Sequence, residues 1–397
     1  MSNERTSLVR RTGRHFLQIP GPTNLPDRVL QAMAQPTIDH RGPDLPVLVG
    51  EIVKGLRSVF NTKGLVIAYP GSATGGWEAA LVNTLSSGDR VLMFDQGHFS
   101  GTWEKMALRL GLEVHLVPGD WRRAVDPNLV QSMLAEDTQK QYKAVLVVHN
   151  ETSTGVTSPI ADIRQAMDRA NHPALLMVDS VSSLGSIEYR HDDWGVDVTI
   201  SGSQKGMMLP PGLCFHAVSE KALAASESAG LPRSYWDWKA MLSFNDTGFL
   251  PYTPATNLLY GLKEALSLLN EEGLDHVYTR HARHGEATRR AVEGWGLEIF
   301  SSCREERSNT VTTVLMPEGW SGDELRGVIL ERFDMSLGGG LGKLRDKVFR
   351  IGHLGDLNDL MLAGTLAGVE LGLIAGGIPH ENNGVRAALD FLAEPTS

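Results

Sequence analysis

The chain has 397 residues, of which 42% are hydrophobic and 21% are charged, and its formal net charge is -10 at pH 7. This length favours two domains, and the composition is that of a globular protein, not of a disordered chain or an integral membrane protein. The negative net charge argues against a nucleic-acid partner, because phosphate binding needs a basic surface.

The two cysteines, Cys214 and Cys303, provide neither a disulfide framework nor a zinc motif. The first residues carry charges but not the apolar core of a signal peptide, and the longest apolar segments have the length of strands. We therefore expect a cytoplasmic protein that holds no metal and is not inserted in a membrane.

From about residue 64, short apolar segments alternate with longer segments of helical periodicity. Strand and helix in alternation predict an α/β fold, with a mostly parallel sheet covered by helices on both faces. Helices are expected near residues 77–85, 103–111 and 160–170. The predicted strands are residues 64–69, 90–95, 113–118, 144–150, 174–180 and 196–201.

After Pro254 the pattern predicts a long helix over residues 257–273, followed by a smaller α+β domain. We divide the chain into an N-terminal segment spanning both domains (1–30), a large domain (31–270) and a small C-terminal domain (271–397). The expected strands of the small domain are residues 297–302, 310–316 and 347–355, and Leu337–Lys343 is expected to form a glycine-rich turn.

Small polar residues follow four of the predicted strands, at residues 71–76, 149–155, 179–183 and 201–205. Any one of these segments is compatible with an ordinary turn. Ligands of parallel sheets bind beyond the carboxyl ends of the strands, and all four segments lie there. The sequence therefore predicts a binding site at this edge of the sheet.

Lys205 follows the predicted apolar strand at residues 196–201 and precedes a glycine and further apolar residues. A solvated lysine is unusual in such a position. A buried lysine favours the neutral amine, which is a nucleophile towards carbonyl groups. The alternative is a lysine that caps a helix or pairs with a carboxylate. Asp179 ends another apolar strand, and it either caps a helix or faces a cationic ring nitrogen. Pyridoxal-phosphate enzymes need such an acid, because a protonated pyridine ring is the better electron sink.

The glycine-rich segment Gly71–Gly76 leads into a helix, so its free backbone N–H groups are able to bind a phosphate. It matches neither the dinucleotide fingerprint nor the nucleotide P-loop, and it is also compatible with a tight connection. Gln204 is a further candidate donor to the phosphate. Trp103 is a candidate for stacking on the ring, unless it is a core residue. Thr152, or else its neighbour Ser153, is a candidate partner of the ring's phenolic oxygen.

Seven segments, in this order, carry a resemblance to a known family. They resemble the class V aminotransferases, and most nearly the serine–glyoxylate and alanine–glyoxylate aminotransferase group, over about residues 17–375. The segments are PGPTNLP (20–26), GSATGGWEAAL (71–81), HNETSTGV (149–156), VDSVSSLGS (178–186), SGSQKGMMLPPG (201–212), PYTPATNLLYGL (251–262) and KVFRIGHLG (347–355).

The resemblance implies a fold-type I pyridoxal-phosphate transferase with a seven-stranded sheet, working as a homodimer with shared active sites. It implies that Lys205 carries the cofactor as a Schiff base and that Asp179 pairs with the pyridinium nitrogen. Trp103 is implied to stack on the ring and Thr152 to bind its phenolic oxygen. The residues implied to bind the phosphate are Ser72, Ala73, Thr74 and Gln204, together with Thr253 from the other subunit.

The same resemblance assigns two residues to the substrate. Arg350 is implied to bind its α-carboxylate, with the bidentate contacts that a guanidinium provides. Gly21 belongs to a segment that lines the substrate pocket in relatives. His40 and Arg41 are left without a role, because a structural role is as plausible as a contact with substrate. Tyr252 is also left open, because this chain departs from the family pattern around it.

The activity implied is transamination in two half-reactions with ping-pong kinetics, in which Lys205 acts as the general base. Serine is the first choice of donor, before alanine and aspartate, and glyoxylate is the acceptor, giving glycine and a 2-keto acid. A cysteine desulfurase or lyase is one alternative, although neither Cys214 nor Cys303 has an activating motif. A non-catalytic ligand sensor is the other, but the stretch before residue 20 is too short for a DNA-binding module. A dehydrogenase is excluded by the missing dinucleotide fingerprint.

Overall fold

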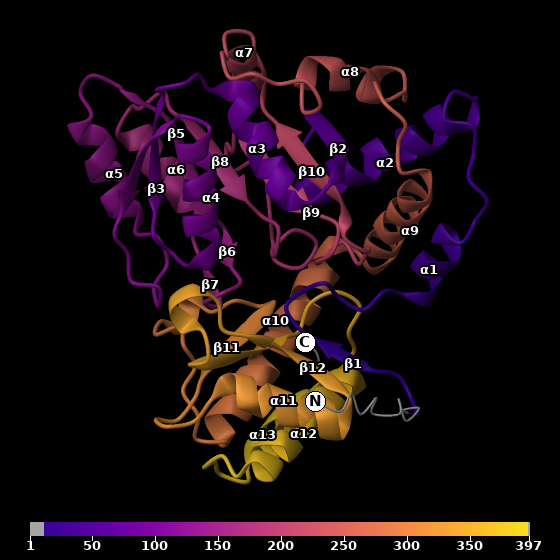
Figure 1. The fold of residues 1–397 in the computed structure, drawn as a ribbon, viewed down its shortest axis with the longest axis vertical. Coiled ribbons are helices and arrows are strands. Elements are labelled where there is room, and N and C mark those ends of the chain that lie inside the picture. The colour runs from indigo at the N-terminus through magenta and orange to yellow at the C-terminus, as the bar shows by residue number, and fades with distance from the viewer. Residues whose placement is uncertain (1–11, 396–397) are drawn as a thin grey trace, which may run out of the picture.

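The computed structural model describes residues 12–395, and these residues form two units of unequal size, each with its own hydrophobic core. Figure 1 shows a large unit with a central sheet in the upper half and a smaller unit below it. Strand β1 (Phe16–Gln18) belongs to the sheet of the smaller unit, whereas Thr23 donates its backbone N–H to Gln204 of the larger one. The described part of the predicted segment 1–30 thus contacts both units, and residues 1–11 lie outside the described residues.

The large unit is built on a seven-stranded sheet with the order β2-β10-β9-β8-β5-β3-β4. Every neighbouring pair is parallel except those of β10, which is antiparallel to both β2 and β9. All six predicted strands form, and the mostly parallel sheet is confirmed. The pattern of the sequence does not predict β10, because a short apolar run is equally compatible with a buried helix segment. The strands are β2 (Leu65–Gly71), β3 (Arg90–Phe94), β4 (Glu113–Val117), β5 (Tyr142–Val148), β8 (Leu175–Asp179), β9 (Val198–Gly202) and β10 (Gly212–Val218).

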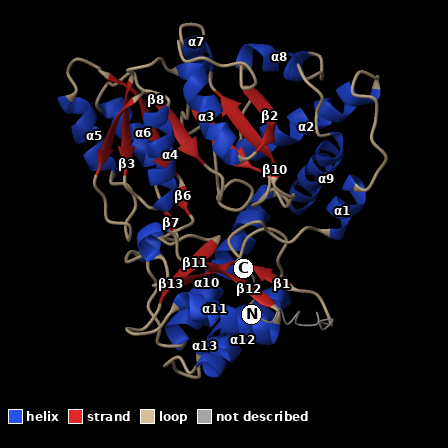
Figure 2. Ribbon diagram, viewed as in Figure 1, coloured by secondary structure: helices blue, strands red, loops and turns tan. Residues whose placement is uncertain are grey.

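Helices cover the faces of this sheet, and Figure 2 shows α3 and α4 in front of it. Their buried residues recur with the helical period; in α2 the spacing of Leu45, Leu48, Val49 and Ile52 presents one apolar face to the core. Helix α9 packs along both α1 and α2. The helices are α1 (Asp27–Met33), α2 (Asp44–Phe60), α3 (Ala73–Thr84), α4 (His98–Arg109), α5 (Pro127–Glu136), α6 (Ile160–Arg169), α7 (Glu220–Ser226), α8 (Trp238–Asp246) and α9 (Thr256–Glu272).

The small unit is a four-stranded sheet of order β1-β12-β13-β11, with helices packed beside it. Residues 297–302 do not form the expected strand and make only a single bridge, between Ile299 and Val314. The first half of the expected turn at Leu337–Lys343 is strand instead. The elements are α10 (Leu274–Gly294), β11 (Val311–Leu315), α11 (Gly322–Phe333), β12 (Met335–Gly339), β13 (Val348–Gly352), α12 (Asp359–Gly376) and α13 (Gly384–Leu392).

Among the described residues, α12 is the one helix whose length and apolar composition would allow it to cross a membrane. It packs against α11 and α13, and it contributes Leu362, Leu366, Val369 and Leu373 to the core of the small unit. Core helices of soluble proteins have the same composition, so this feature is weak evidence for a membrane span.

Candidate active site

A cavity of about 210 Å³ lies at the carboxyl edge of the large sheet, where the polar ends of β2, β5, β8 and β9 meet. The four polar segments identified in the sequence all contribute to its lining, as their positions at the strand ends predict. Eight of the predicted site residues line this cavity: Gly21, Ser72, Ala73, Thr74, Thr152, Asp179, Gln204 and Lys205.

Lys205 follows β9, and its amine lies inside the cavity wall, where Nζ donates a hydrogen bond to the carbonyl oxygen of Pro20. Burial lowers the pKa of the amine to about 8, and the nearby charge of Arg350 acts in the same direction. Asp179 and Glu151 oppose this shift. About half of the amine is therefore neutral near pH 8, and the neutral amine is the state that attacks a carbonyl group.

Asp179 ends β8 and places its carboxyl group in the same cavity. Its Oδ1 accepts a hydrogen bond from the backbone N–H of Val181 at 2.7 Å, and its Oδ2 accepts one from the indole Nε1 of Trp77 at 3.0 Å. Burial raises the pKa of this carboxyl to about 7, and the two hydrogen bonds limit the rise. The carboxyl group is thus oriented by two fixed donors and can pair with a cation in the cavity.

The N-terminus of α3 forms one wall of the cavity. Ser72 precedes the helix, and its side chain makes no capping hydrogen bond, while Ala73 and Thr74 begin the first turn. The first backbone N–H groups of a helix have no partner within the helix, so they are available to an anion. A Cβ on Gly202 would lie 3.2 Å from Cβ of Ala73, so a glycine at the end of β9 lets the first turn approach the strand.

The lining of the cavity does not include Trp103, so the cavity geometry gives no support to the predicted stacking role. Its indole is fully buried behind Trp77, and the two rings stack with centroids 5.8 Å apart and planes 16° from parallel. Phe99, one helical turn earlier in α4, lines the cavity instead. The sequence carried both aromatic residues in the same stretch, and the helical phase decides which of them reaches the cavity.

Arg350 does not line the cavity but lies directly behind its wall. In β13 its guanidinium group donates from Nε to the carbonyl of Gly339 and from Nη1 to the carbonyl of Thr152, both at 2.8 Å. Within residues 12–395, no group forms a hydrogen bond or ion pair with Nη2. Burial lowers the pKa of Arg350 to about 10, so the group stays charged at neutral pH.

Four other residues from the sequence analysis do not line the cavity of this chain. Thr253 is exposed, and His40 and Arg41 are partly and fully exposed, respectively. Tyr252 stacks on Tyr235 with ring centroids 4.6 Å apart, and its buried hydroxyl group has no hydrogen-bond partner among the described residues.

Glu151 is a buried carboxylate beside the cavity to which the sequence analysis assigned no role. Its side chain accepts hydrogen bonds from the backbone N–H groups of Phe99, Ser100 and Ser153, at 3.1, 3.2 and 3.1 Å, and from the hydroxyl of Ser153 at 2.6 Å. Two of these donors belong to the first turn of α4, where a carboxylate is favourable. Glu151 thereby fixes the turn that carries Phe99. Its position within a turn-like segment gave no sequence signal for this contact.

The comparisons with known proteins agree with this geometry. The family profile described as aminotransferase class-V matches residues 15–329. The chain belongs to the class V aminotransferases. It is 48% identical over 393 residues to the serine–glyoxylate aminotransferase of Methylorubrum extorquens, covering 97% of this chain and 98% of the relative. It is 41% identical to the L-aspartate–glyoxylate aminotransferase of Paracoccus denitrificans, covering 97% and 98%. The crystal structure of the alanine–glyoxylate aminotransferase of Nostoc sp. is similar, with a TM-score of 0.86, 31% identity, and coverage of 94% and 98%.

Class V aminotransferases depend on pyridoxal 5′-phosphate, and the cavity fits this group. It combines a buried amine at Lys205, a buried carboxyl at Asp179 and a helix N-terminus at Ser72–Thr74. These are the chemical partners that an aldehyde, a ring nitrogen and a phosphate require. The fold-type I architecture expected from the resemblance is confirmed by the same comparisons.

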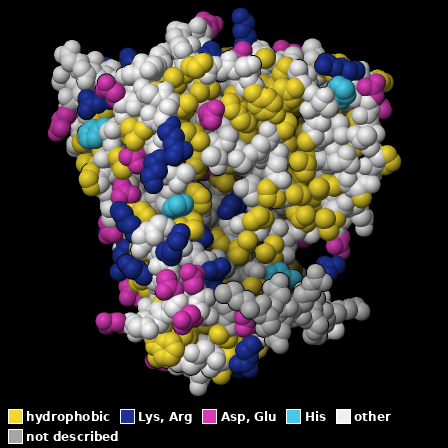
Figure 3. Space-filling model, in the orientation of Figure 1, with side chains coloured by type: hydrophobic (Ala, Val, Ile, Leu, Met, Phe, Trp, Pro, Cys, Tyr) yellow, Lys and Arg dark blue, Asp and Glu magenta, His cyan; other side chains and the backbone are white. Residues whose placement is uncertain are grey.

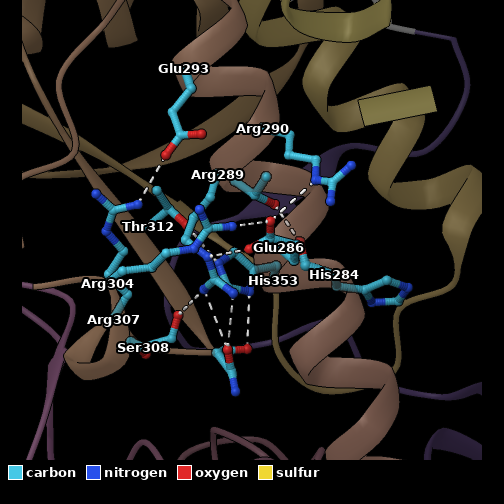
Figure 4. Close-up of polar contacts among 12 residues, drawn as sticks. His284, Glu286, Arg289, Arg290, Glu293, Arg304, Arg307, Ser308, Thr312 and His353 are labelled. Atoms are coloured by element: carbon cyan, nitrogen blue, oxygen red, sulfur yellow. Dashed lines mark hydrogen bonds and ion pairs between the residues drawn. The ribbon is translucent and has the colours of Figure 1, made fainter. Parts of the chain in front are cut away.

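In this class V aminotransferase the hairpin of β6 (Asn150–Glu151) and β7 (Val156–Thr157) connects the cavity wall to the small unit. Asn150 lines the cavity and donates to the hydroxyl of Thr310 at 2.9 Å, and Gly155 accepts from the backbone N–H of Ser308 at 2.9 Å. Figure 4 shows Arg289 of α10 between Glu286 and Ser308, and its Nη1 donates to the carbonyl of Ser308 at 3.1 Å. Ser308 and Thr310, which contact the hairpin, therefore belong to a segment that α10 of the small unit holds in place.

Proposed function

We propose that this protein catalyses pyridoxal-phosphate-dependent transamination, with L-serine as the preferred donor and glyoxylate as the acceptor. The observation that carries the proposal is the pairing of a buried, weakly basic amine with a buried carboxyl group in one cavity, beside a helix N-terminus. The reaction converts serine and glyoxylate to hydroxypyruvate and glycine, so one amino group moves and nothing is oxidised overall.

We assign the cofactor to the residues that line the cavity. Lys205 binds its aldehyde carbon, Asp179 its ring nitrogen and Thr152 its phenolic oxygen, and Phe99 covers the ring in place of Trp103. When bound, the cofactor withdraws electrons from the substrate's α-carbon and makes the Cα–H bond acidic. The residues proposed for the phosphate are Ser72, Ala73, Thr74 and Gln204, with Thr253 of a second copy.

The chain's own residues supply the proton transfer and the orientation. Nζ of Lys205 takes the proton from the α-carbon of the amino acid and returns it in the reverse half-reaction, for which a pKa near 8 is suited. Arg350 holds the α-carboxylate, because its guanidinium plane is fixed by Gly339 and Thr152 and its Nη2 is not occupied by either. Gly21 keeps the backbone close to Lys205 and leaves room for the substrate.

The choice of serine rests on similarity, since the 48%-identical relative is named a serine–glyoxylate aminotransferase. Aspartate and alanine remain second choices, because the other relatives carry those donors in their names. Discrimination among the three depends on a few buried polar groups that are left unpaired by the wrong donor.

We further propose a cytoplasmic homodimer with shared sites and no nucleic-acid or membrane partner. Large apolar side chains are exposed on the same unit as Thr253, with Val47 at 66% and Leu30 and Tyr235 at 46% exposure, which favours a contact with a second copy. On the face drawn in Figure 3, Lys and Arg side chains are interspersed with Asp and Glu, and no continuous basic surface is present there. This distribution does not favour nucleic acid.

A cysteine desulfurase is disfavoured by the two thiols. Cys214 is fully buried in β10, where burial raises the pKa of its thiol to about 12. The pKa of Cys303 is also raised, chiefly by its hydrogen bond with Glu305, and neither cysteine lines the cavity. A non-catalytic ligand sensor is disfavoured by the retained amine and carboxyl pair.

The decisive experiment adds single amino acids to the purified, cofactor-loaded protein and follows its visible absorption band. Serine should bleach the band and glyoxylate should restore it, with glycine as the product; alanine and aspartate should act more slowly. Cysteine should release no sulfide. The proposed reaction is wrong if none of the three donors bleaches the band.

The residue assignment is tested with Lys205→Ala, for which we expect loss of turnover with retention of non-covalently bound cofactor. Lys143→Ala, a change at an exposed lysine of β5, serves as the control and should behave as the wild type. Near-normal transamination by Lys205→Ala would remove Lys205 from the mechanism.

A further inference from the structure

Trp77 contacts the acid of the cavity directly. It lies in α3, is 3% exposed and lines the cavity. Its indole N–H points at Asp179 and donates to Oδ2 at 3.0 Å. A tryptophan N–H has no acceptor capacity, so this hydrogen bond favours the ionised carboxylate over the neutral acid.

The surroundings of Asp179 make this donor important. Burial and the neighbouring carboxylate of Glu151 favour the protonated acid. The phenol of Tyr189 also lies near Asp179, but burial raises the pKa of that phenol far above its ordinary value, so it stays neutral. Three groups favour the ionised carboxylate instead: the backbone N–H of Val181, the indole of Trp77 and the charge of Lys205. Val181 and Trp77 are the fixed donors, since the charge of Lys205 depends on pH and on its use in the reaction. Each oxygen of the carboxylate thus has one permanent donor.

The position of Trp77 is itself fixed by packing. Its ring stacks on Trp103, with centroids 5.8 Å apart, and the glycine before it allows close approach of α3 to the sheet. A Cβ on Gly76 would lie 2.9 Å from Cγ2 of Ile200 in β9. The same helix begins with the proposed phosphate residues, so α3 orients the groups at both ends of the cofactor.

We propose that Trp77 is a positioning residue that holds the carboxylate of Asp179 ionised and aimed at the ring nitrogen of the cofactor. This rests on the proposed function, because it assigns Asp179 to that nitrogen. The indole acts through Asp179 and takes no part in moving protons or electrons at the substrate.

The structure offers a matched pair of variants. Trp77→Phe removes an indole N–H that binds Asp179, whereas Trp103→Phe removes one that has no partner among the described residues. Both residues are buried aromatics in the same stack, so the two changes cost similar packing. Circular dichroism and melting temperature establish that both variants are folded. If phenylalanine leaves the site too loose, benzothienylalanine at position 77 keeps the tryptophan shape without the N–H.

The first measurement uses the protein without cofactor or substrate. Infrared titration of the ¹³C-aspartate-labelled protein, with Asp179→Asn to assign the band, gives the protonation of Asp179 directly. Loss of one hydrogen bond to a charged group predicts a rise of about one pH unit in the midpoint for Trp77→Phe. Trp103→Phe should leave the midpoint where it is in the wild type. Equal midpoints in the two variants would overturn the proposal, whatever the substrate proves to be.

The second measurement uses the loaded enzyme. Trp77→Phe should bind pyridoxal phosphate roughly tenfold more weakly, and its kcat should fall most at acidic pH and recover as the pH rises. The KM for serine should stay within twofold, because Arg350 is untouched. A kcat loss that is the same at every pH, or shared by Trp103→Phe, would reduce Trp77 to a packing role. Failure of the wild type to transaminate serine would count against the proposed function alone.

Discussion

A Cβ at position 21 would lie 2.4 Å from Cδ of Lys205, so the reactive lysine packs directly against a bare α-carbon. Gly21 also has a φ of 95°, which side chains rarely adopt. Because the lysine is confined by the cavity wall, an added methyl group must displace it from its position.

We expect Gly21→Ala to lower kcat by at least tenfold and to weaken the covalent attachment of the cofactor, measured by the absorbance of the loaded protein. Gly13→Ala provides the control, since Gly13 has a φ of 87° and no atom of residues 12–395 lies within 4 Å of an added Cβ. Both changes carry backbone strain, but only the first meets Lys205. Equal losses of activity would assign the effect to strain.

The buried amine of Lys205 predicts a pH-dependent stability of the cofactor-free protein. Its pKa is about 8 in the folded state against 10.5 for a free lysine, so the unfolded chain binds more protons between these values. Stability therefore rises as the pH increases from about 8 to 10.5, and the full penalty is present below pH 8. Lys205→Met removes this penalty and should be more stable at pH 7 by up to about 3 kcal/mol.

Urea unfolding of the cofactor-free protein at pH 7 and pH 10 checks this expectation. The advantage of Lys205→Met should be largest at pH 7 and should shrink towards pH 10. Lys143→Met, at an exposed site, should show no such dependence. An advantage that grows with pH would mean that the lysine is stabilised in its charged form.

The guanidinium of Arg350 should determine substrate affinity and not cofactor loading. Lysine lacks the planar fork, so Arg350→Lys cannot keep the contacts with Gly339 and Thr152 and also bind a carboxylate. We expect kcat/KM for serine to fall roughly 100-fold, mainly through KM, with pyridoxal-phosphate binding unchanged. Steady-state kinetics with a parallel cofactor titration measures both. Weaker cofactor binding with an unaltered KM would indicate that Arg350 acts on the cofactor and not on the substrate carboxylate.

Glu151 should support both the fold and the cofactor. Glu151→Gln replaces a carboxylate that accepts from four donors by an amide that has only one acceptor oxygen. We expect a loss of about 1–3 kcal/mol in the free energy of unfolding, together with weaker cofactor binding through displacement of Phe99. Glu104→Gln in α4, where no hydrogen bond among residues 12–395 is lost, should change neither quantity.

Much of the fold could be predicted from the sequence, because the pattern of apolar residues indicates which segments are buried. The strands that end in Val148 and Asp179 are apolar on both faces, and this alone identifies a covered parallel sheet. The antiparallel strand β10 has the same composition, so its direction and its place in the sheet are not encoded in any short pattern. The small sheet was harder to predict, because β12 consists of Met-Ser-Leu-Gly-Gly and consecutive glycines are typical of a turn.

The candidate site, like the fold, could be predicted from the sequence only in part. Lys205 and Asp179 stand at strand ends, where chain position alone fixes which edge of the sheet they reach. Phe99 and Trp103 differ by only four positions in α4, and the choice between them depends on how the helix is rotated against Trp77. The link between Trp77 and Asp179 joins residues 102 positions apart, so only the assembled structure reveals it.

The hairpin of β6 and β7 is fastened on one side to Ser182 of the large unit and on the other to Thr310 and Ser308 of the small one. A rotation of the small unit must therefore move the cavity wall, because the residues of the hairpin line the cavity and also contact the small unit. Heat should accordingly melt the two hydrophobic cores in a single calorimetric transition, and a ligand in the cavity should delay the loss of both together.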